Sequence, residues 1–342
     1  TFSLLEQLQV HRIKYATFSL SGEPIIKSID AALQKARNAN VDVIISFGGG
    51  SVIDAGKAVA ALMNNPGDVL DYLEVIGKGK KILKNPLPHI AIPTTAGTGT
   101  EVTKNAVLRS EVHNVKVSLR HNLMIPTAAI IDPELTYSVP PDVTASTGMD
   151  ALTQLIEPFV CNQANPMTDG LCREGISRAA RSLKAAFFNG TDKSAREDMA
   201  IASLFGGIAL ANAKLGAVHG FAGSIGGMFD APHGAVCARL LPFVVEENIS
   251  ALKERQPNSP ILARFAEIAQ LLTDRADAQA ADGLEWLFQL IDNLAIPSLS
   301  MYGLQKIDIE AVVTKSLNAS SMKGNAIQLT KKERADILQK AL

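Results

Sequence analysis

The chain has few cysteines and lacks the spacings that structural zinc sites and redox centres use. Its 342 residues include three cysteines, Cys161, Cys172 and Cys237, and no CxxC pair occurs. An odd number of widely spaced cysteines does not predict a disulfide framework. We interpret all three as buried or idle thiols in a reducing compartment.

No apolar run is long enough to cross a membrane, and no basic run is long enough to form a nucleic-acid surface. Hydrophobic residues make up 47% of the chain, but Gly, Pro or a charge interrupts each apolar run. The 33 basic and 34 acidic residues are interleaved and give a net charge of −1. These features argue against a membrane or a nucleic acid as the main partner. The N-terminus lacks a signal-peptide pattern, so we expect a cytoplasmic protein.

The length and the hydrophobic periodicity predict two domains of different class. In residues 1–140, helical patterns alternate with short apolar strands, which predicts an α/β domain with a parallel, Rossmann-like sheet. In residues 141–342 strand patterns nearly vanish, which predicts an all-helical domain. The expected helices span residues 25–38, 167–187, 195–212 and 261–272, with another that opens at Ser51. The expected strands span residues 41–47, 89–93 and 128–132.

Two glycine-rich loops follow predicted strands of the first domain. The first, Gly48-Gly49-Gly50-Ser51, lies between a strand and a helix, where backbone N–H groups can bind phosphate. It is not the GxGxxG fingerprint. A tight turn with Ser51 as helix N-cap and Asp54 as a capping acid explains it equally well.

The second loop favours nucleotide binding. Residues 93–101, Pro-Thr-Thr-Ala-Gly-Thr-Gly-Thr-Glu, offer four hydroxyl groups and two glycines after another strand. Hydroxyl groups can bind phosphate oxygens and a carboxamide because they both donate and accept hydrogen bonds. Loops that follow parallel strands lie at the same edge of a sheet, where ligands bind in this architecture.

The ordered motifs resemble the iron-containing (group III) alcohol dehydrogenases, close to the maleylacetate reductase branch. They lie at residues 48–58, 93–103, 148–153, 218–220 and 232–234. The resemblance implies an α/β nucleotide-binding domain and an all-helical metal domain, as in dehydroquinate synthase-like folds, and a homodimer. It also implies NAD or NADP as cofactor. The implied cofactor-binding residues are Gly49, Gly50, Ser51, Asp54, Thr94, Thr95, Thr98, Asn105 and Lys116.

Two qualifications concern the cofactor. Without the resemblance, Lys116 would be interpreted as a solvated charge on a strand. Family members open with a strand and helix that carry an acid for the adenosine ribose, and this sequence starts within the following helix. We expect about one βα unit, roughly 30 residues, to be missing, so the choice between NAD and NADP stays open.

The resemblance further implies a divalent metal, iron or zinc, in the helical domain. Asp150, His219 and His233 match three of the four family ligands, and Gln154 stands where a histidine is expected. An amide oxygen is a harder and weaker ligand than imidazole. The site therefore either keeps metal with Gln154 as a distant oxygen ligand or binds metal poorly. Glu157 is interpreted as a helix-surface or capping residue, or as a compensating ligand.

A second departure from the family is Gly223, which stands where many members have a proton-transferring histidine. The proton relay must then run through water, a ribose hydroxyl or another group. Phe159, Phe221 and Phe229 are interpreted either as substrate-pocket residues or as plain core.

We expect reversible NAD(P)-dependent hydride transfer between an alcohol and an aldehyde or ketone, assisted by the metal, with His219 and His233 as catalytic residues. One alternative is a reductase of keto or unsaturated acids with little metal dependence. In it the two histidines bind a carboxylate or donate a proton. Others are a nucleotide-binding paralogue without turnover and the chemistry of dehydroquinate synthases.

Overall fold

The computed structural model describes residues 2–342 and divides them into two compact units. The first unit runs to Thr94 and resumes over Thr100–Asp132. The second contains Thr95–Gly99 and Pro133–Leu342. The domain limits of 1–140 and 141–342 stay a prediction, because compactness alone is not evidence of independent folding.

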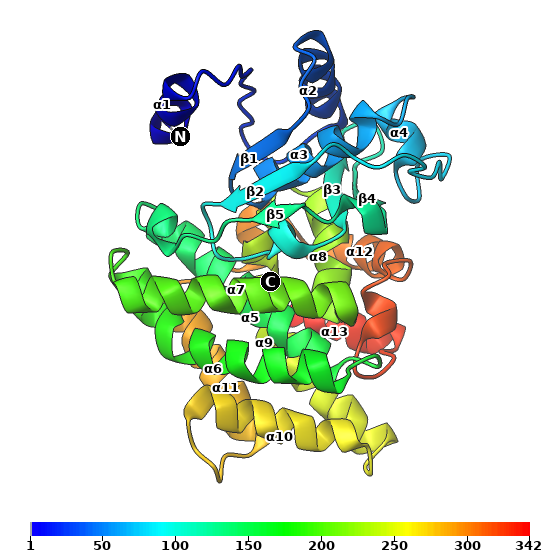
Figure 1. Ribbon diagram of the computed structural model, residues 1–342. Coiled ribbons are helices and arrows are strands. Elements are labelled where there is room, and N and C mark those ends of the chain that lie inside the picture. Colours follow the sequence, from blue (N-terminus) through cyan, green and yellow to red (C-terminus); the bar gives the residue numbers. More distant parts are fainter. Residues whose placement is uncertain (1) are drawn as a thin grey trace. The chain divides into compact units, whose positions relative to one another are not determined.

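A parallel three-stranded sheet organises the first unit. Strands β1 (Ile44–Gly48), β2 (His89–Pro93) and β5 (Ala128–Ala129) lie in the order β1-β2-β5. Helix α3 (Gly50–Met63) packs against β1 and β2, and α2 (Ile26–Asn38) packs against α3 (Figure 1). The expected parallel sheet with helices is therefore confirmed.

The first unit also contains an antiparallel hairpin that the sequence did not lead us to expect. Strands β3 (Asn105–Ser110) and β4 (Val115–Arg120) pair with each other and form a separate sheet. Leu108 and Leu119 are buried and join the hydrophobic core of this unit. The remaining elements of the unit are α1 (Phe2–Val10), α4 (Val69–Tyr72), η1 (Thr100–Val102) and η2 (Asn122–Met124).

Helices alone build the second unit. In Figure 1, α6 lies beside α5 and α7, and all three pack against one another. Local sequence fixes several ends: Asn165 and Thr168 form a capping box at α6, and Asp192 caps α7. The helices are α5 (Pro141–Val160), α6 (Pro166–Phe188), α7 (Lys193–Asn212), α8 (Ala217–Met228), α9 (His233–Arg255), α10 (Pro260–Thr273), α11 (Ala280–Asn293), α12 (Ile309–Ser316) and α13 (Lys331–Ala341).

The core of the second unit contains two of the phenylalanines considered as pocket residues. Phe159 and Phe221 are fully buried, and Phe229 packs against the same core. The guanidinium groups of Arg173 and Arg264 lie 5.1 Å and 4.6 Å from the centre of the Phe159 ring. Phe159 is therefore a core residue.

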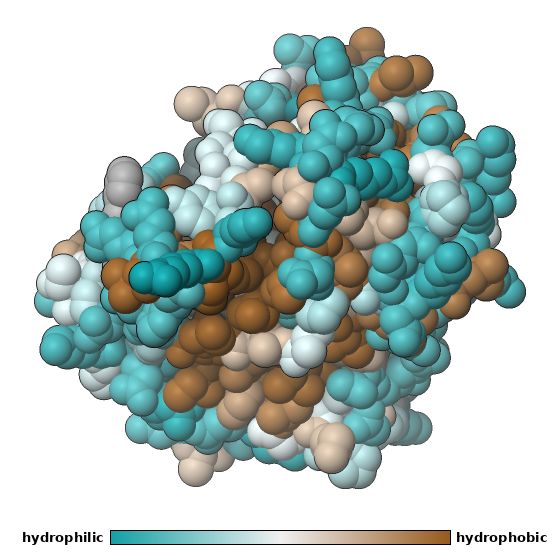
Figure 2. Space-filling model, turned by 45° about the horizontal axis from the view of Figure 1, so that its top comes forward, coloured by the Kyte–Doolittle hydropathy of each residue, from teal (hydrophilic) through white to brown (hydrophobic). Residues whose placement is uncertain are grey.

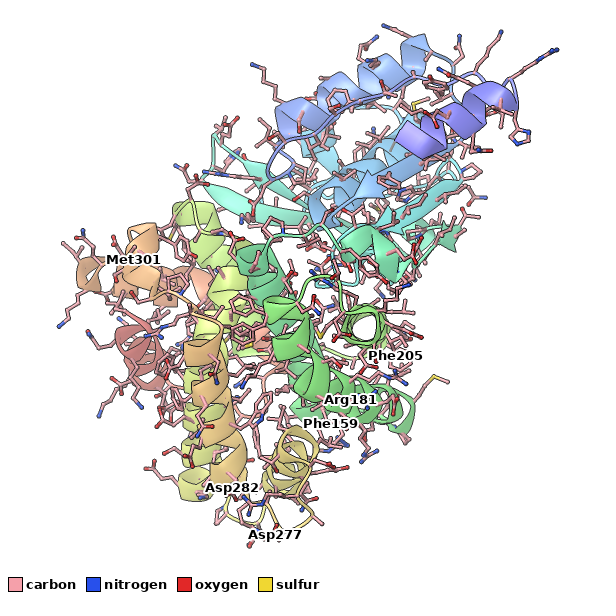
Figure 3. The ribbon with its side chains drawn as sticks, turned by 90° about the vertical axis from the view of Figure 1, so that its left-hand side faces the viewer. Phe159, Arg181, Phe205, Asp277, Asp282 and Met301 are labelled. Atoms are coloured by element: carbon pink, nitrogen blue, oxygen red, sulfur yellow. The ribbon has the colours of Figure 1, made fainter. Side chains whose placement is uncertain are left out.

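Charged residues stabilise the turn between α10 and α11. Asp277 and Asp282 lie at the turn between α10 and α11 (Figure 3), where Arg275 pairs with both carboxylates. Asp282 also accepts the backbone N–H of Gln279 at 2.7 Å, which completes a capping box at the start of α11. The turn is held by local charge and capping.

The visible surface is mixed. In Figure 2, hydrophilic side chains spread over much of the face shown, and hydrophobic side chains gather around its centre. Exposed large hydrophobic residues are frequent near the start of the chain, at Val10, Ile13, Tyr15 and Phe18. Within residues 2–342, no single helix is long and apolar enough to span a membrane; α7 and α8 reach that length only as a pair bent by 97°.

Candidate metal centre and nucleotide-binding turns

The first glycine-rich turn joins β1 to α3. Helix α3 starts at Gly50. Its N-cap is Gly49, so no side chain caps the first N–H groups of the helix. Ser51 lies inside the first helical turn, so its interpretation as N-cap is wrong. Backbone N–H groups at such a helix start lack intrahelical partners and favour an anion. This geometry suits the phosphate role expected for Gly49, Gly50 and Ser51.

Asp54 is a buried anchor within the first unit. Its carboxylate accepts the hydroxyl of Thr100 and the backbone N–H of Val107, the latter at 2.9 Å. It also pairs with Lys57 at 3.1 Å. The interpretation of Asp54 as a capping acid is wrong, because its oxygen atoms bind these partners instead of the start of α3.

Lys57 is a structural residue that sequence reasoning missed. Its side chain is 0% exposed, and its ammonium group donates to the Thr100 carbonyl at 2.9 Å and to the Thr103 hydroxyl at 3.1 Å. It also donates to the carbonyl of Asn105. Burial lowers the pKa of Lys57, and the Asp54 charge opposes that shift. The lysine thus ties α3 to the segment that follows the second loop.

The second loop belongs partly to each unit. The backbone N–H of Thr94 donates to the carbonyl of Gly48 at 3.0 Å, so the ends of β1 and β2 are joined. Gly99 has φ +57°, and a Cβ there would lie 2.5 Å from the Ser203 carbonyl oxygen of α7. The residues between, which include the expected Thr95 and Thr98, therefore lie close to the helices of the second unit.

Two expected cofactor residues lie on the hairpin of the first unit. Asn105 opens β3, and Lys116 lies in β4. The Lys116 side chain is 5% exposed, and its ammonium group pairs with Glu23. The interpretation of Lys116 as a solvated charge is therefore wrong.

Asp150, His219 and His233 come together within the second unit. Asp150 Oδ1 lies 3.3 Å from His219 Nε2 and 3.8 Å from His233 Nε2, and the two imidazole rings are 5.5 Å apart. These side chains come from α5, α8 and α9 respectively. A four-coordinate ion with bonds of about 2.0–2.2 Å holds its ligands roughly 3.3–3.6 Å apart. The spacing therefore fits a divalent metal.

Two orphaned atoms support this fit. Asp150 and His219 are 1% and 9% exposed. Among the buried side-chain atoms of residues 2–342, Asp150 Oδ1 and His219 Nε2 are two that have no hydrogen-bond partner of acceptable geometry. Unsatisfied buried polar atoms are costly unless an ion or water completes them. These two atoms face each other at the place where a metal would bind.

Glu157 contacts the ring nitrogen of His219 that faces away from Asp150. Its carboxylate accepts His219 Nδ1–H and the backbone N–H of Val218, each at 2.7 Å. Glu157 is 4% exposed, so its interpretation as a helix-surface residue is wrong, whereas the capping role is correct at the start of α8. A carboxylate on Nδ1 fixes the tautomer that presents Nε2 to a metal.

Gln154 and Gly223 are the two positions at which the sequence departs from the family pattern. Gln154 lies one turn after Asp150, and its amide nitrogen donates to the carbonyl of Thr98 at 2.6 Å. At Gly223, an added Cβ would meet nothing within 4 Å. Gln154 thus joins α5 to the second loop, and Gly223 leaves open space on α8.

Cys237 is a candidate ligand that sequence reasoning missed. Its sulfur lies 3.7 Å from His233 Nε2, one turn earlier on α9, and its ligand atom and those of Asp150, His219 and His233 all lie within 4.8 Å of one another. Cys237 is buried, as expected, and its position beside these side chains makes it a candidate ligand as well. The spacing of a histidine and a cysteine four residues apart on one helix was the signal available.

The pKa values at this centre are coupled. For Asp150, burial acts to raise the pKa, but the charges of His233 and His219 outweigh it and the pKa is lowered. Burial also opposes a charge on His219, and its contacts with Cys237, Asp150 and Glu157 raise its pKa well above the ordinary value. Burial raises the pKa of the Cys237 thiol to about 12. The centre therefore concentrates negative charge around His219.

A parallel sheet with a glycine-rich helix start, together with a helical unit that holds a carboxylate–imidazole cluster, defines the class of nucleotide-dependent, metal-using oxidoreductases. Family models agree. "Iron-containing alcohol dehydrogenase" matches residues 2–133, and "Fe-containing alcohol dehydrogenase family, C-terminal" matches residues 144–342. The chain belongs to the iron-containing alcohol dehydrogenase family.

Individual relatives extend this result. The chain is 35% identical to alcohol dehydrogenase 4 of Saccharomyces cerevisiae over 319 aligned residues. The aligned region covers 93% of this chain and 80% of the yeast protein. It superimposes on an alcohol dehydrogenase from Oenococcus oeni with a TM-score of 0.91 and 32% identity, covering 100% and 88% of the two chains. A sulfoacetaldehyde reductase from Bifidobacterium kashiwanohense, solved in complex with NAD+, gives a TM-score of 0.84, 26% identity and coverage of 99% and 88%.

Proposed function

We propose that this protein interconverts a small alcohol and the corresponding aldehyde or ketone with NAD or NADP. The observation that carries the proposal is the cluster of Asp150, His219 and His233 in a chain of this family. Alcohol dehydrogenases among its relatives support the reaction class, and the NAD+ complex of one relative supports a nicotinamide cofactor.

The metal centre and the glycine turns have separate tasks in this reaction. A divalent metal, when bound, would polarise the substrate oxygen and stabilise the charge that develops on it. Asp150, His219 and His233 would hold that ion, and Glu157 keeps the His219 ring in the orientation that presents Nε2. In the first unit, the start of α3 at Gly50 binds cofactor phosphate through its backbone N–H groups.

Helix α8 carries glycine at position 223, where many family members have a proton-transferring histidine, so the proton needs another route. Gly223 provides no side chain, and the space beside its Cα is open. Water in that space, or a hydroxyl of the cofactor ribose, carries the alcohol proton to solvent. A Gly223→His variant would add an imidazole there and give the pH–rate profile a new ionisation near the ordinary histidine pKa of about 6.5.

A metal-reconstitution assay tests the proposal. Protein treated with a strong chelator is divided into portions that receive iron(II), zinc(II), manganese(II) or buffer, and each is assayed with a panel of short alcohols and aldehydes. The proposal predicts turnover that chelation abolishes and metal restores. Asp150→Asn should remove turnover, whereas Asp308→Asn, at the start of α12 and outside the metal cluster, should not.

Other outcomes of the same assay decide between the rival functions. Turnover of a keto acid that survives chelation would support a metal-independent reductase, in which His219 and His233 bind the carboxylate. NADH binding without turnover of any carbonyl compound would support a nucleotide-binding paralogue.

We also propose that the protein is a cytoplasmic homodimer that pairs through its first unit. The exposed hydrophobic residues near the start of the chain support this pairing, because Val10 is 70% exposed and Ile13 is 53% exposed. Light scattering on the purified protein should give a dimer mass, and a Val10→Asp/Ile13→Asp double variant should lower it to that of a monomer.

A further inference from the structure

The metal centre has lost one family ligand without leaving a free side chain in its place. Gln154 occupies the position of the missing histidine, and its amide nitrogen is held at 2.6 Å from the Thr98 carbonyl. Gln154 is 3% exposed, so this bond is shielded from water. This hydrogen bond holds the amide group against the second loop, and turning the group toward another partner would break it at a cost of about 1–3 kcal/mol.

Cys237 lies where a fourth ligand would be needed. The distance of 3.7 Å from its sulfur to His233 Nε2 is close to the roughly 3.5–3.6 Å that a tetrahedral zinc site gives for a thiolate and an imidazole. Cys237 is fully buried on α9, the helix that carries His233. Its direction is therefore fixed by the same helix that fixes one of the histidines.

The other distances agree with a single ion among four atoms. Asp150 Oδ1 lies 3.3 Å from His219 Nε2 and 3.8 Å from His233 Nε2, and all four ligand atoms lie within 4.8 Å of one another. Two of these atoms, Asp150 Oδ1 and His219 Nε2, have no hydrogen-bond partner of acceptable geometry within residues 2–342. One ion can contact all four atoms once their separations are the roughly 3.3–3.6 Å of a four-coordinate site.

We propose that Cys237 is the fourth protein ligand of this centre, so that the metal is held by Asp150, His219, His233 and Cys237 in place of a one-Asp, three-His set. The inference rests on the metal of the proposed function and adds the identity of a ligand. As the sulfur–metal bond forms, the thiol proton passes to solvent and Cys237 binds as thiolate. No oxidant or reductant takes part.

The change of ligand alters the chemistry of the centre. A thiolate is softer than imidazole and favours zinc over oxygen-preferring ions. It also brings a second negative charge beside Asp150, so a divalent ion with these four ligands is formally neutral instead of singly positive. We therefore expect the protein to retain zinc in preference to iron(II) when both are offered in equal amount under reducing conditions.

Cobalt spectroscopy tests the thiolate directly. Cobalt(II) replaces the bound metal, and the near-ultraviolet thiolate-to-cobalt charge-transfer band is recorded for wild type and three variants. Wild type, Gln154→Leu and the control Cys172→Ser should show the band. Cys172 is a suitable control because it is equally buried and its pKa is likewise raised to about 12, but it lies on α6. Cys237→Ser should lose the band and bind cobalt at least about tenfold more weakly.

Absorption-edge fine structure of the zinc form provides a measurement that needs no variant. The proposal predicts one sulfur neighbour at about 2.3 Å beside nitrogen and oxygen neighbours at about 2.0–2.2 Å. A zinc shell without sulfur, a cobalt form without the band, or a band that persists in Cys237→Ser would overturn it. Dehydrogenase activity in a protein without the sulfur neighbour would support the proposed function and overturn the ligand assignment. A sulfur neighbour in a protein without activity would support the ligand assignment and overturn the proposed function.

Discussion

At the scale of single residues, one buried carboxylate, Glu157, orients a histidine of the candidate metal centre. It accepts a hydrogen bond from His219 Nδ1 and another from the start of α8, each at 2.7 Å. Both contacts fix the same ring, one directly and one through the helix that carries it. The orientation of His219 therefore depends on α5 as much as on α8.

A Glu157→Gln variant should weaken metal binding. The amide keeps the size of the side chain but removes the charge that increases the basicity of His219, and we expect a loss of about 10- to 100-fold in zinc affinity. Competition with a chromophoric chelator measures this change. Glu246→Gln, at a surface carboxylate paired with Lys340, is the control and should bind zinc as wild type does. Equal affinity in both variants would contradict the assigned role.

His89 should make the stability of the protein depend on pH. Burial, followed by the nearby charge of Lys57, lowers its pKa to about 4, and its Nδ1 has no hydrogen-bond partner among the described residues. Between about pH 4 and pH 6.5, His89 is therefore mostly neutral in the folded protein but mostly protonated in the unfolded chain. The free energy of unfolding should fall as the pH drops from about 6.5 to about 4, by up to about 3 kcal/mol.

Urea denaturation across this pH range, with a His89→Leu variant beside wild type, measures the effect. The variant loses the partner of Ser46, 2.8 Å from the His89 ring, so its absolute stability changes as well. The informative quantity is the slope with pH, which should be shallower in the variant. Identical slopes would show that another group is responsible.

The residues that sequence reasoning located and those it missed differ in one physical respect. Asp150, His219 and His233 belong to ordered motifs, and the structure brings them together as a metal cluster. The role of Lys57 depends on which segment folds against it, and this information is not local in the sequence. The buried Lys57, in particular, resembles any lysine of an amphipathic helix until Thr100–Asn105 is seen to surround it.

At the scale of elements, the second loop depends on a glycine in the left-handed region. Gly99→Ala would place a methyl group 2.5 Å from the Ser203 carbonyl at φ +57°. Gly79, at φ +67° with nothing within 4 Å of its Cβ position, is a matched control. Gly79→Ala should cost about 1 kcal/mol from backbone strain alone, and Gly99→Ala clearly more. Equal losses in urea denaturation would show that the contact with α7 is unimportant.

The link between α3 and the segment after the second loop can be tested in the same way. Lys57→Met would leave the Asp54 carboxylate and four oxygen acceptors without their cation, and we expect a loss of about 3–5 kcal/mol in the free energy of unfolding. Lys78→Met removes an exposed ion pair with Asp71 and should have no measurable effect. Chemical denaturation of both variants would detect the difference, and similar stabilities would contradict the structural role of Lys57.

Most elements of the fold were predictable because their patterns are long and regular. The expected helices at residues 167–187, 195–212 and 261–272 agree with α6, α7 and α10 within about two residues at each end. The strand at residues 89–93 agrees with β2. A strand around Lys116 was expected, but its pairing with β3 in a hairpin was not, because both strands carry charged residues and alternation alone does not identify the partner strand.

At the scale of the whole molecule, membership of one family links the glycine-rich turn and the histidine cluster to a single function. A glycine-rich turn or a buried histidine pair has many uses, but both belong to one chain whose two parts match the models of a single family. The sequence could identify that family from its ordered motifs. It did not single out Cys237, whose spacing from His233 on one helix is a weak signal until Asp150 and His219 are seen beside it.

Isotope transfer tests the central claim most directly. The metal-loaded protein is incubated with NAD+ and a short primary alcohol that carries deuterium at both C1 positions, and the reduced cofactor is examined by mass spectrometry. Our account predicts that each molecule of NADH formed contains one deuterium, delivered from the alcohol carbon to the nicotinamide ring. Reduced cofactor without deuterium, or no reduction with any alcohol and either cofactor, would contradict it.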